Sequence, residues 1–434
     1  MTRSSHPHPT GTLRSLYLCY LSLDDPLVHT QVIAYLEGLA ARGHHIHLLT
    51  YEPRRLGRVE RRRIARDLRG RGIAWRALRY HKRPSLPATV YDALAGAVVG
   101  TWLVRRHRLA AVHARSHVPA AAALIIRRLT GCELIFDIRG LMAEEYVDAG
   151  RWPPHGAAFR ITKAVERAAI ARAAGIVVLT ERIRTQLFGE RARDDLAVIP
   201  CCADLARLGA AASSSGARVR ARLGLPDAPA MVYVGKFAGW YMQREMVDFH
   251  AVAREAIGDL HFLVLTQDEP GLVLSEFERR GTPATAYTVT AAPPEEVGAI
   301  LAAADFGISF IRAAPSKASS SPTKIGEYLG AGLPIVCGSG VGDLDALIGD
   351  ELGVLVSEFD DAAYRATAQR IAALAADPAV AERCREAARE QLSLEGVGIP
   401  RYDSLYRRVA RAPSRNYEPS SSPRRGRRAG CTKT

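Results

Sequence analysis

The sequence predicts two α/β domains, each a doubly wound, Rossmann-like parallel sheet, that face each other across a cleft. A length of 434 residues, with 48% hydrophobic and 24% charged residues, is too long for one ordinary core and fits two domains of about 200 residues each. Short apolar runs alternate with alanine-rich helical stretches in two successive series, as expected for parallel strands joined by helical crossovers. Between the series, residues 205–217 lose this periodicity and collect Ser, Ala and Gly, which is typical of a linker.

The first series opens at Leu13 with a strand, a helix and a second strand. The helix places Val32, Leu36 and Leu39 on one face and ends at Gly43, so this opening is a βαβ unit. Six strands are predicted in this half, at residues 16–23, 46–50, 111–114, 133–137, 175–180 and 196–200.

The second series predicts six more strands, at residues 231–235, 261–266, 285–290, 306–310, 333–337 and 352–356. Open parallel sheets bind ligands outside the carboxyl ends of their strands, so strand-to-helix loops of both halves should line the cleft. The predicted organisation is a disordered N-terminus at 1–12, a first domain at 13–204, a linker at 205–217, a second domain at 218–396, a C-terminal helix at 397–411 that packs back on the first domain, and a disordered basic tail at 412–434.

The formal charge of +14 is concentrated in two segments. Residues 54–83 hold thirteen Lys and Arg against two acidic residues, and the tail from Pro413 holds six against one, which leaves the rest nearly neutral. Four apolar residues recur in the first segment with imperfect helical spacing, Leu56, Val59, Ile64 and Leu68. This pattern fits an amphipathic helix on an anionic membrane surface and, equally, a solvated basic face. Nucleic acid is not an expected partner, because neither aromatic interleaving nor a helix-turn-helix pattern accompanies the charge.

Nothing in the sequence predicts a membrane span or a secretory signal. No apolar run approaches about 18 uninterrupted residues, and the first residues lack the apolar middle of a signal peptide. We therefore expect a cytoplasmic protein, with peripheral attachment to the inner face of the membrane left open. The seven cysteines are scattered and lack metal-ligand spacing, so reduced thiols and no metal site are expected.

The segment SSSPTKIGEYLGAGLPIV, residues 319–336, is the most informative for function. Pro322 and Thr323 suit the start of a helix, whose first N–H groups, together with the Lys324 ammonium, would bind a phosphate. Glu327 lies on the same helix face as Lys324, where its carboxylate can accept hydrogen bonds from vicinal ribose hydroxyls. Taken alone, the pattern also fits a solvated Lys–Glu pair on a short helix.

This segment resembles the retaining glycosyltransferases of family 4, which have the GT-B fold. In that family a glutamate just before text like GLPIV binds the donor ribose, which implies this role for Glu327. The family's other glutamate, eight residues earlier, is replaced by Ser319. Related text extends over nearly the whole chain, in DDPLVHTQV, VHARSH, FDIRGLMAEEYVDAG, VVLTERI, VIPCCADL, YVGKF and GVGDLD.

The resemblance also implies a pocket for the donor diphosphate. In YVGKFAGWY, Gly235 precedes Lys236, which stands at the family's diphosphate-binding arginine, and the place of the partner lysine falls near Tyr241. Lys324 should then supply the second cation, with Arg244 as an alternative, and the ammonium groups of Lys236 and Lys324 should converge on one diphosphate. Further donor contacts are expected from Thr266, Gln267 and Thr290 and, in a mobile segment, from Arg312.

Acceptor contacts are expected from the loops of the first domain. FDIRGLMAEEYVDAG follows a buried strand and presents Asp137, Arg139, Glu144 and Glu145. We expect Arg139 to act in catalysis; a buried Arg139–Asp137 pair that only fixes the loop is the alternative. The other expected acceptor residues are Thr30, Gln31, Arg115 and Ser116.

The resemblance implies transfer of a sugar from a nucleotide-diphosphate donor to a hydroxyl acceptor, with retention at the anomeric carbon. No metal or other cofactor is expected, because the lysines and the helix amides can neutralise the leaving diphosphate. The acceptor should belong to the cell envelope, to an exopolysaccharide or to another glycoconjugate, either lipid-linked or soluble. The alternatives are a nucleotide-sugar epimerase on the same fold and a non-enzymatic basic protein that binds membranes or nucleic acid.

Overall fold

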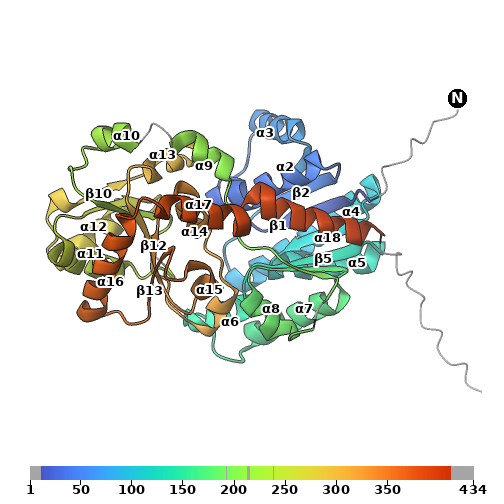
Figure 1. Ribbon diagram of the computed structural model, residues 1–434. Coiled ribbons are helices and arrows are strands. Elements are labelled where there is room, and N and C mark those ends of the chain that lie inside the picture. The colour runs from blue at the N-terminus through green and yellow to red at the C-terminus, as the bar shows by residue number, and fades with distance from the viewer. Residues whose placement is uncertain (1–10, 192, 213–215, 238, 412–434) are drawn as a thin grey trace, which may run out of the picture.

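The computed structural model describes residues 11–191, 193–212, 216–237 and 239–411. Two parallel sheets, of seven and six strands, form two domains that lie side by side (Figure 1). The predicted fold class, two doubly wound α/β domains, is confirmed. The N-terminus and basic tail predicted to be disordered fall almost entirely outside the described residues.

The first sheet has the strand order β3-β2-β1-β4-β5-β6-β7, and all its pairs are parallel. Strand β1, an inner strand of this sheet, places Leu16 opposite His47 of β2 and Val112 of β4. The elements of this domain are β1 Arg14–Cys19, α1 Pro26–Val28, the π-helix η1 His29–Ile33, α2 Ala34–Ala41, β2 His45–Glu52, α3 Arg58–Gly70, β3 Ile73–Arg79, α4 Ser85–His107, β4 Ala111–Arg115, α5 His117–Thr130, β5 Glu133–Ile138, α6 Met142–Asp148, α7 Ala157–Arg172, β6 Gly175–Val178, α8 Glu181–Phe188 and β7 Leu196–Val198.

The second sheet, also parallel, has the order β10-β9-β8-β11-β12-β13. Its elements, followed by the C-terminal helices, are α9 Leu205–Ala212, α10 Gly216–Leu223, β8 Ala230–Val234, α11 Gln243–Ile257, β9 His261–Leu265, α12 Pro270–Arg280, η2 Ala284–Ala286, β10 Tyr287–Thr290, η3 Pro294–Glu296, α13 Val297–Leu301, β11 Phe306–Ser309, the 3₁₀ helix η4 Pro315–Ser319, α14 Thr323–Ala331, β12 Ile335–Gly338, α15 Leu344–Ile348, β13 Gly353–Val356, α16 Asp361–Ala375, α17 Val380–Gln391, the π-helix η5 Leu394–Gly398 and α18 Ile399–Arg411.

Helices cover both faces of each sheet, which explains the continuous apolar runs in the strands. Each sheet therefore has two apolar cores, one on either face. Both sheets reverse their strand order once, between β1 and β4 and between β8 and β11. These two reversals are the places where ligands of doubly wound sheets bind.

The C-terminal helix α18 lies across the first domain, as the red ribbon in Figure 1 shows. Tyr402, Leu405 and Tyr406 of this helix are buried in a core that it shares with β1 and α2. Tyr406 Oη lies 2.8 Å from Nδ1 of the buried His113. The chain therefore crosses between the domains a second time, and α18 ties the end of the second domain to the first.

Three features of the first half of the chain differ from the sequence expectation. The stretch 205–217, predicted to be a linker, forms helix α9, which packs against α13 and α14, and the start of α10; residues 213–215 lie outside the described part. A strand, β3, was missed at residues 73–79, because arginines at 76 and 79 interrupt its apolar pattern. On α3, Leu68 is buried and Ile64 packs against the core, so these two apolar residues are turned toward the protein, whereas Val59 is 84% exposed.

Candidate active site

A cavity of about 560 Å³ lies between the two domains, at the carboxyl ends of both sheets. Its lining follows the strands at which each sheet reverses its order, β1 and β4 in the first domain and β8 and β11 in the second. The polar and aromatic residues that line it include Tyr20, Arg115, Ser116, Arg139 and Glu145 from the first domain and Trp240, Tyr241, Lys317 and Thr323 from the second. The cleft predicted from the sequence is therefore present.

A second cavity, of about 430 Å³, meets the first at Thr323, which lines both. The rest of its lining includes Thr30 and Gln31 of η1, Asp204 and Arg207 after β7, and Glu327 of α14. The start of α14 thus lies where two hollows join. This arrangement suits an elongated ligand whose charged middle rests on the helix start.

Lys324, in the first turn of α14, is only 4% exposed. Its Nζ donates to Tyr233 Oη at 2.9 Å and lies over the rings of Tyr233 and Tyr241, 4.0 and 3.5 Å from their centroids. Burial lowers the pKa of Lys324 well below its usual value, and the Glu327 carboxylate offsets this only in part. The two aromatic faces hold the amine in place, and an anion bound beside it would favour the protonated form.

Glu327 lies one turn further along α14 and lines the second cavity. Its side chain is 15% exposed, and Arg207 Nη2 lies 3.9 Å from its Oε1. Burial raises the pKa of Glu327, against the lowering effect of Arg207 and Lys324. The next residue, Tyr328, is fully buried, and its Oη accepts a hydrogen bond from Val234 N at 2.9 Å. Helix α14 is thus fixed to the sheet by one side while its acidic residue faces the cavity.

Gly235 and Lys236 follow β8 and differ in their surroundings. Gly235 has a φ of 115°, a conformation that glycine adopts readily, and a Cβ there would lie 3.5 Å from Lys324 Nζ. Lys236 has an exposed side chain, and its carbonyl accepts a hydrogen bond from Tyr233 Oη. The predicted convergence of the two ammonium groups is therefore not seen: tyrosines enclose Lys324, whereas Lys236 lies at the surface. A donor contact of Lys236 stays a prediction.

Arg139 lies at the edge of the larger cavity, with its side chain 11% exposed. Its Nη2 donates to Cys201 Sγ at 3.1 Å, and its Nη1 lies 3.7 Å from Asp137 Oδ1. Asp137 is fully buried and accepts a hydrogen bond from Tyr402 Oη at 3.0 Å. Burial opposes ionisation of this carboxyl, but Arg139 and His113 hold the pKa of Asp137 below its usual value. The Asp137 carboxylate is thus enclosed and pairs with Arg139, which itself lines the cavity, and its predicted acceptor contact stays a prediction.

The two glutamates of α6 have different partners. Glu144 Oε1 pairs with Lys163 Nζ at 2.8 Å, and Glu144 is not among the described residues that line either cavity, so its acceptor contact stays a prediction. Glu145 lines the larger cavity and pairs with Lys317 Nζ at 3.1 Å. Lys317 is 4% exposed, and its Nζ lies 3.8 Å from the centroid of the Trp240 ring. Sequence reasoning missed Lys317 and Trp240. The available signals were that Lys317 is a basic residue just before the predicted phosphate segment and that Trp240 follows the GKF sequence of the diphosphate loop.

The segment around Lys317 joins the two domains. Its residues 316–319 are buried in the 3₁₀ helix η4, where a mobile segment was expected. Besides the Lys317–Glu145 pair, three hydrogen bonds connect η4 to the first domain: Thr180 Oγ1 donates to Ala318 O at 2.6 Å, Ser316 N donates to Asp148 Oδ2 at 3.1 Å, and Leu141 N donates to Ser319 Oγ at 3.3 Å. We call η4, with Glu145 and Trp240, the interdomain clasp. Arg312, which precedes it, is exposed, and its N donates to Trp240 O at 3.0 Å.

The remaining predicted acceptor residues fall on two sides of the site. Thr30 and Gln31 line the second cavity, beside Glu327. Gln31 Nε2 donates to Cys202 O at 2.9 Å, and its buried Oε1 has no hydrogen-bond partner within the described part of the chain. Arg115 and Ser116 line the larger cavity. Ser116 has a φ of 73°, and left-handed strain at a residue other than glycine is common at functional sites.

The residues predicted to contact the donor base lie outside both described linings. Thr266 N donates to Thr290 O at 2.9 Å, and Gln267 Nε2 donates to Ala292 O at 3.1 Å. Their contact with a base stays a prediction. Arg244 has a side chain that is 67% exposed and lies 3.8 Å from Asp248, so it is a surface residue.

No group of three His, Cys, Asp or Glu side chains within the described residues is placed to hold a metal ion. One Asp-x-Asp sequence, at Asp343 and Asp345, uses its carboxylates on the backbone. Asp343 accepts hydrogen bonds from the N atoms of Glu181 and Arg182, at 2.7 and 3.0 Å, and Asp345 accepts one from Gly340 N at 2.9 Å. Independence of metal stays a prediction.

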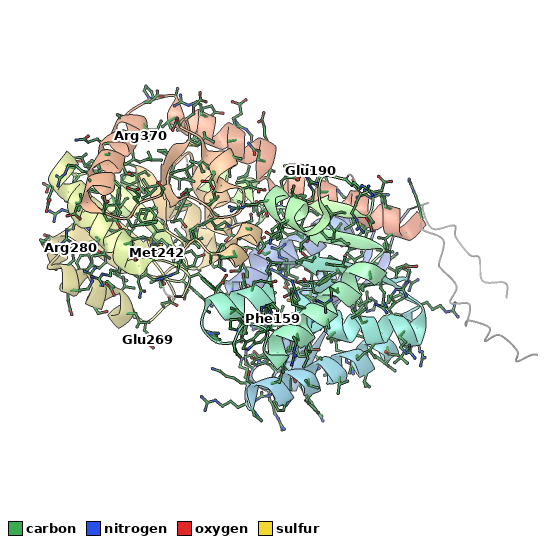
Figure 2. The ribbon with its side chains drawn as sticks, turned by 90° about the horizontal axis from the view of Figure 1, so that it is seen from below. Phe159, Glu190, Met242, Glu269, Arg280 and Arg370 are labelled. Atoms are coloured by element: carbon green, nitrogen blue, oxygen red, sulfur yellow. The ribbon has the colours of Figure 1, made fainter. Side chains whose placement is uncertain are left out.

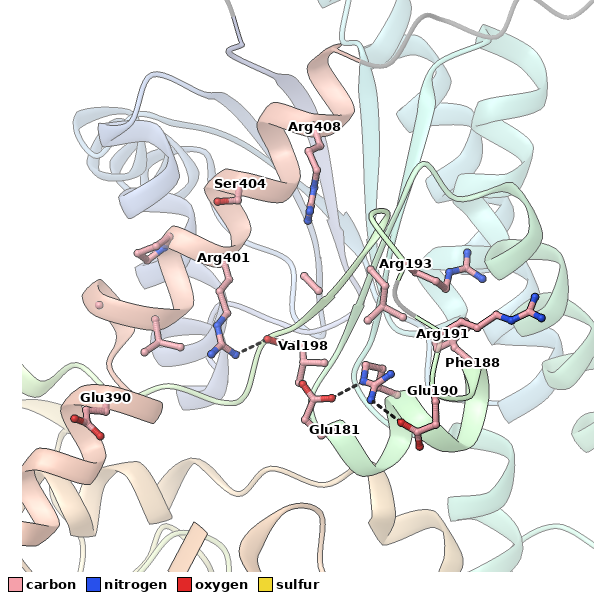
Figure 3. A pocket seen from close by; sticks show the side chains of 16 residues that line it. Glu181, Phe188, Glu190, Arg191, Arg193, Val198, Glu390, Arg401, Ser404 and Arg408 are labelled. Atoms are coloured by element: carbon pink, nitrogen blue, oxygen red, sulfur yellow. Dashed lines mark hydrogen bonds and ion pairs between the residues drawn. The ribbon is translucent and has the colours of Figure 1, made fainter. Parts of the chain in front are cut away.

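A larger hollow, of about 850 Å³, lies between α18, α8 and β7 (Figure 3). Arg401 Nη1 donates to Val198 O there at 2.7 Å, and Arg184 pairs with Glu181 and Glu190. None of its lining residues is shared with the two cavities at α14. It therefore forms no part of the candidate active site.

Comparisons with known proteins agree with this geometry. Residues 28–202 match the family described as "Glycosyl transferase 4-like domain". Among solved structures, a sucrose-phosphate synthase from Thermosynechococcus elongatus is similar at a TM-score of 0.70 and 16% identity, covering 92% of this chain and 99% of that one. No curated protein gave a significant match.

Two further structures are similar over most of the chain. HepE of Anabaena, in complex with UDP-glucose, has a TM-score of 0.65 at 13% identity, with 91% of this chain and 99% of that one covered. WaaG, a glycosyltransferase involved in lipopolysaccharide biosynthesis, has a TM-score of 0.65 at 16% identity, with 90% and 98% covered.

The two facing sheets and the family match define the class of this protein as a glycosyltransferase with the GT-B fold. Residues 28–202 match the glycosyl transferase 4-like (group 1) domain, and the chain as a whole is similar in fold to solved GT-B glycosyltransferases. The class predicted from the sequence is confirmed.

Proposed function

We propose that this protein transfers a sugar from a nucleotide-diphosphate donor to a hydroxyl group of a cell-envelope, exopolysaccharide or other glycoconjugate acceptor, with retention at the anomeric carbon. The observation that carries the proposal is the position of Lys324, a buried amine beside the point at which two cavities meet. The diphosphate rests on the start of α14, the ribose lies toward Glu327 in the smaller cavity, and the sugar lies in the larger one.

The chemistry follows from the charge that the leaving group develops. The bond from the anomeric carbon to the diphosphate oxygen breaks, and the Lys324 ammonium and the first N–H groups of α14 stabilise the negative charge on that oxygen. The acceptor oxygen attacks the face that the diphosphate leaves, and its proton passes to a β-phosphate oxygen. No protein nucleophile and no metal ion take part in this scheme.

The acceptor side is supplied by the first domain. Arg115, Arg139 and Glu145 line the larger cavity, as does the strained Ser116, which follows Arg115 after β4. Guanidinium donors and a carboxylate acceptor suit an acceptor substrate rich in hydroxyl groups. Arg139 is the group of this set that we expect to affect turnover most, because Asp137 and Cys201 fix its guanidinium.

The similar solved structures indicate which donor and which acceptor to test first. HepE is known in complex with UDP-glucose, so UDP-sugars are the first donors to test. WaaG is described as involved in lipopolysaccharide biosynthesis, and an envelope acceptor reached from the cytoplasmic face of the membrane agrees with that relative.

A thermal-shift series with UDP, GDP, ADP and dTDP identifies the base, because a ligand that binds only the folded state stabilises it by about 2.7 kcal/mol at a hundredfold excess over its Kd. The sugar is then identified by incubating the matching nucleotide-sugars and following the anomeric proton by NMR. Transfer with retention supports the proposal. Conversion of the donor to a 2-epimer without acceptor would establish an epimerase instead, and the absence of binding by all four nucleotides would refute both.

A further inference from the structure

Helix α4 carries a ridge of exposed apolar side chains that the candidate active site does not use. Every fourth residue along its length is large, apolar and about half exposed or more: Leu86 49%, Val90 51%, Leu94 51%, Val98 70% and Trp102 49%. Tyr91, at 60%, widens the ridge. At a rise of about 1.5 Å per residue the ridge is about 24 Å long, which is far more exposed apolar surface than scattered single residues produce.

By length and composition α4 is the one described helix that could cross a membrane. Less than half of its most apolar window is buried. Its other side is nevertheless held by the protein: Asp92 is fully buried and accepts a hydrogen bond from Tyr20 Oη at 2.8 Å, and Gly96 and Gly100 lie closely against Tyr51 and Ile126. A helix fixed to its own domain along one side can lie on a membrane but not pass through it.

Arginines surround the ridge at its C-terminal half. Arg61, Arg62 and Arg69 of α3 line a common hollow with Trp102 and His107 of α4. Arg76 of β3 lies over the Trp102 ring, 4.8 Å from its centroid, and Arg105 and Arg106 in the last turn of α4 are exposed. An apolar ridge with an amphipathic tryptophan and neighbouring arginines is complementary to the surface of an anionic bilayer.

A groove leads from this ridge to the active site. A cavity of about 510 Å³ lies between α4, α5, α6 and α7, and its lining is mainly apolar and aromatic. At one end it is lined by Leu86 and Val90 of the ridge and by Ile161 of α7, which is 56% exposed; Phe159 marks α7 in Figure 2. At the other end it has five residues in common with the cavity between the domains, Tyr20, Leu21, Val118, Met142 and Tyr146.

We propose that α4 and α3 place the enzyme on an anionic membrane and that this groove, lined by α4, α5 and α7, receives the hydrocarbon chain of a lipid-linked acceptor, whose hydroxyl end lies in the cleft. The proposal rests on the proposed transferase function and specifies its acceptor. A chain that enters between Leu86, Val90 and Ile161 passes tyrosine and tryptophan side chains before it reaches Tyr20 and Tyr146, where the cavity between the domains begins.

Membrane binding is tested by co-sedimentation with vesicles of phosphatidylcholine alone and with about 30% phosphatidylglycerol. We expect the wild type to bind the anionic vesicles and Leu94→Asp to lose at least about tenfold of that partitioning, because a carboxylate on the ridge opposes entry into lipid. Leu272→Asp is the matched control, since Leu272 lies on α12 of the other domain at 50% exposure, and it should bind like the wild type.

Equal binding by both variants, or no binding by the wild type, overturns the proposal. So does complete release at about 1 M salt, which would assign binding to the arginines alone.

The groove is tested with dansyl-undecanoic acid, whose fluorescence rises on entering an apolar site. We expect a saturable increase with the wild type and its loss in Ala121→Trp, since Ala121 lines the groove and the larger side chain fills it. Thr162→Phe provides a second blocking variant should the first fold poorly. Both variants should keep the thermal shift produced by the nucleotide, which shows that the fold and the donor site are intact and separates this proposal from the transferase function. Unchanged fluorescence in two folded blocking variants refutes the groove.

Discussion

Replacing Lys324 with methionine separates its role in catalysis from its effect on the fold. Methionine keeps an unbranched side chain of similar length but removes the ammonium group and its hydrogen bond to Tyr233 Oη. That hydrogen bond to the uncharged Tyr233 hydroxyl contributes about 0.5–1.5 kcal/mol to folding. Burial of the amine costs free energy, because the amine is desolvated, as the lowered pKa of Lys324 indicates. The two terms oppose each other, so the free energy of unfolding should change by no more than about 1 kcal/mol.

The effect on the reaction should be much larger. Loss of a charged hydrogen bond to the diphosphate weakens ground-state binding by about 1.5–3 kcal/mol, or about 10- to 160-fold in Kd. Loss of a donor that stabilises the charge developing on the leaving group lowers kcat by a further factor of about 10² to 10³. The first quantity is measured by calorimetry with the nucleoside diphosphate, and the second by single-turnover transfer at saturating donor.

Lys236→Met is the matched control, because Lys236 follows Gly235 on the adjacent loop but has an exposed side chain. We expect it to lose less than about tenfold in kcat/KM, as is usual for a solvent-screened cation. Near-normal turnover by Lys324→Met would refute the role given to this residue. Equal losses in the two variants would show instead that both ammonium groups reach the diphosphate in the bound state, as the sequence predicted.

Three further changes test other parts of the site. Glu327→Gln should weaken UDP binding about tenfold, because the charge-assisted hydrogen bonds to the ribose hydroxyls become weaker. A 2′,3′-dideoxy analogue of UDP should bind the wild type and the variant with equal affinity. Unequal affinities for that analogue would contradict the ribose contact. Lys317→Met removes the 3.1 Å ion pair with Glu145 and should let the two domains move apart. X-ray scattering should then show a larger radius of gyration, and kcat should fall. An unchanged radius would show that the ion pair does not hold the domains together. Burial lowers the pKa of Lys324, whereas a bound diphosphate raises it, so UDP binding at a pH above the lowered pKa should take up a proton. The binding enthalpy measured by calorimetry should then depend on the ionisation enthalpy of the buffer. Identical enthalpies in phosphate and Tris would exclude proton uptake.

The sequence was sufficient for those parts of the site that depend on local structure. The start of α14, with Thr323, Lys324 and Glu327, was predicted because helix-start residues and a spacing of three along a helix are local properties. The strand series predicted the cleft for the same reason, since the carboxyl ends of parallel strands share one edge.

The contacts that sequence reasoning missed join residues far apart in the chain. Asp137 was expected at the surface of the cleft, but Tyr402, from the last helix, covers it at 3.0 Å. Tyr233 and Tyr241 enclose Lys324, and Trp240 packs on Lys317, through pairings that no spacing reveals. Side-chain partners from different elements depend on how the elements pack.

Helix α4 was missed for a different reason. Its alanines and glycines, with valines and leucines between them, give a composition typical of a buried helix, and no polar face appears in the sequence to show which side is exposed. The one buried charge, Asp92, lies on the side that contacts Tyr20 and Tyr51. Only the packed structure shows that the opposite side has apolar residues and no covering element among the described residues.

Helix α6 connects the groove to the interdomain clasp. Met142 and Tyr146 line the groove, while Glu145 and Asp148 of the same helix bind Lys317 and Ser316 of the clasp. A chain in the groove and a closed clasp therefore contact the same short helix. Coupling between two binding events is reciprocal. If the closed clasp strengthens binding of the acceptor chain, the bound chain stabilises the closed clasp by the same free energy. Closure in turn brings the loops of the first domain against the start of α14.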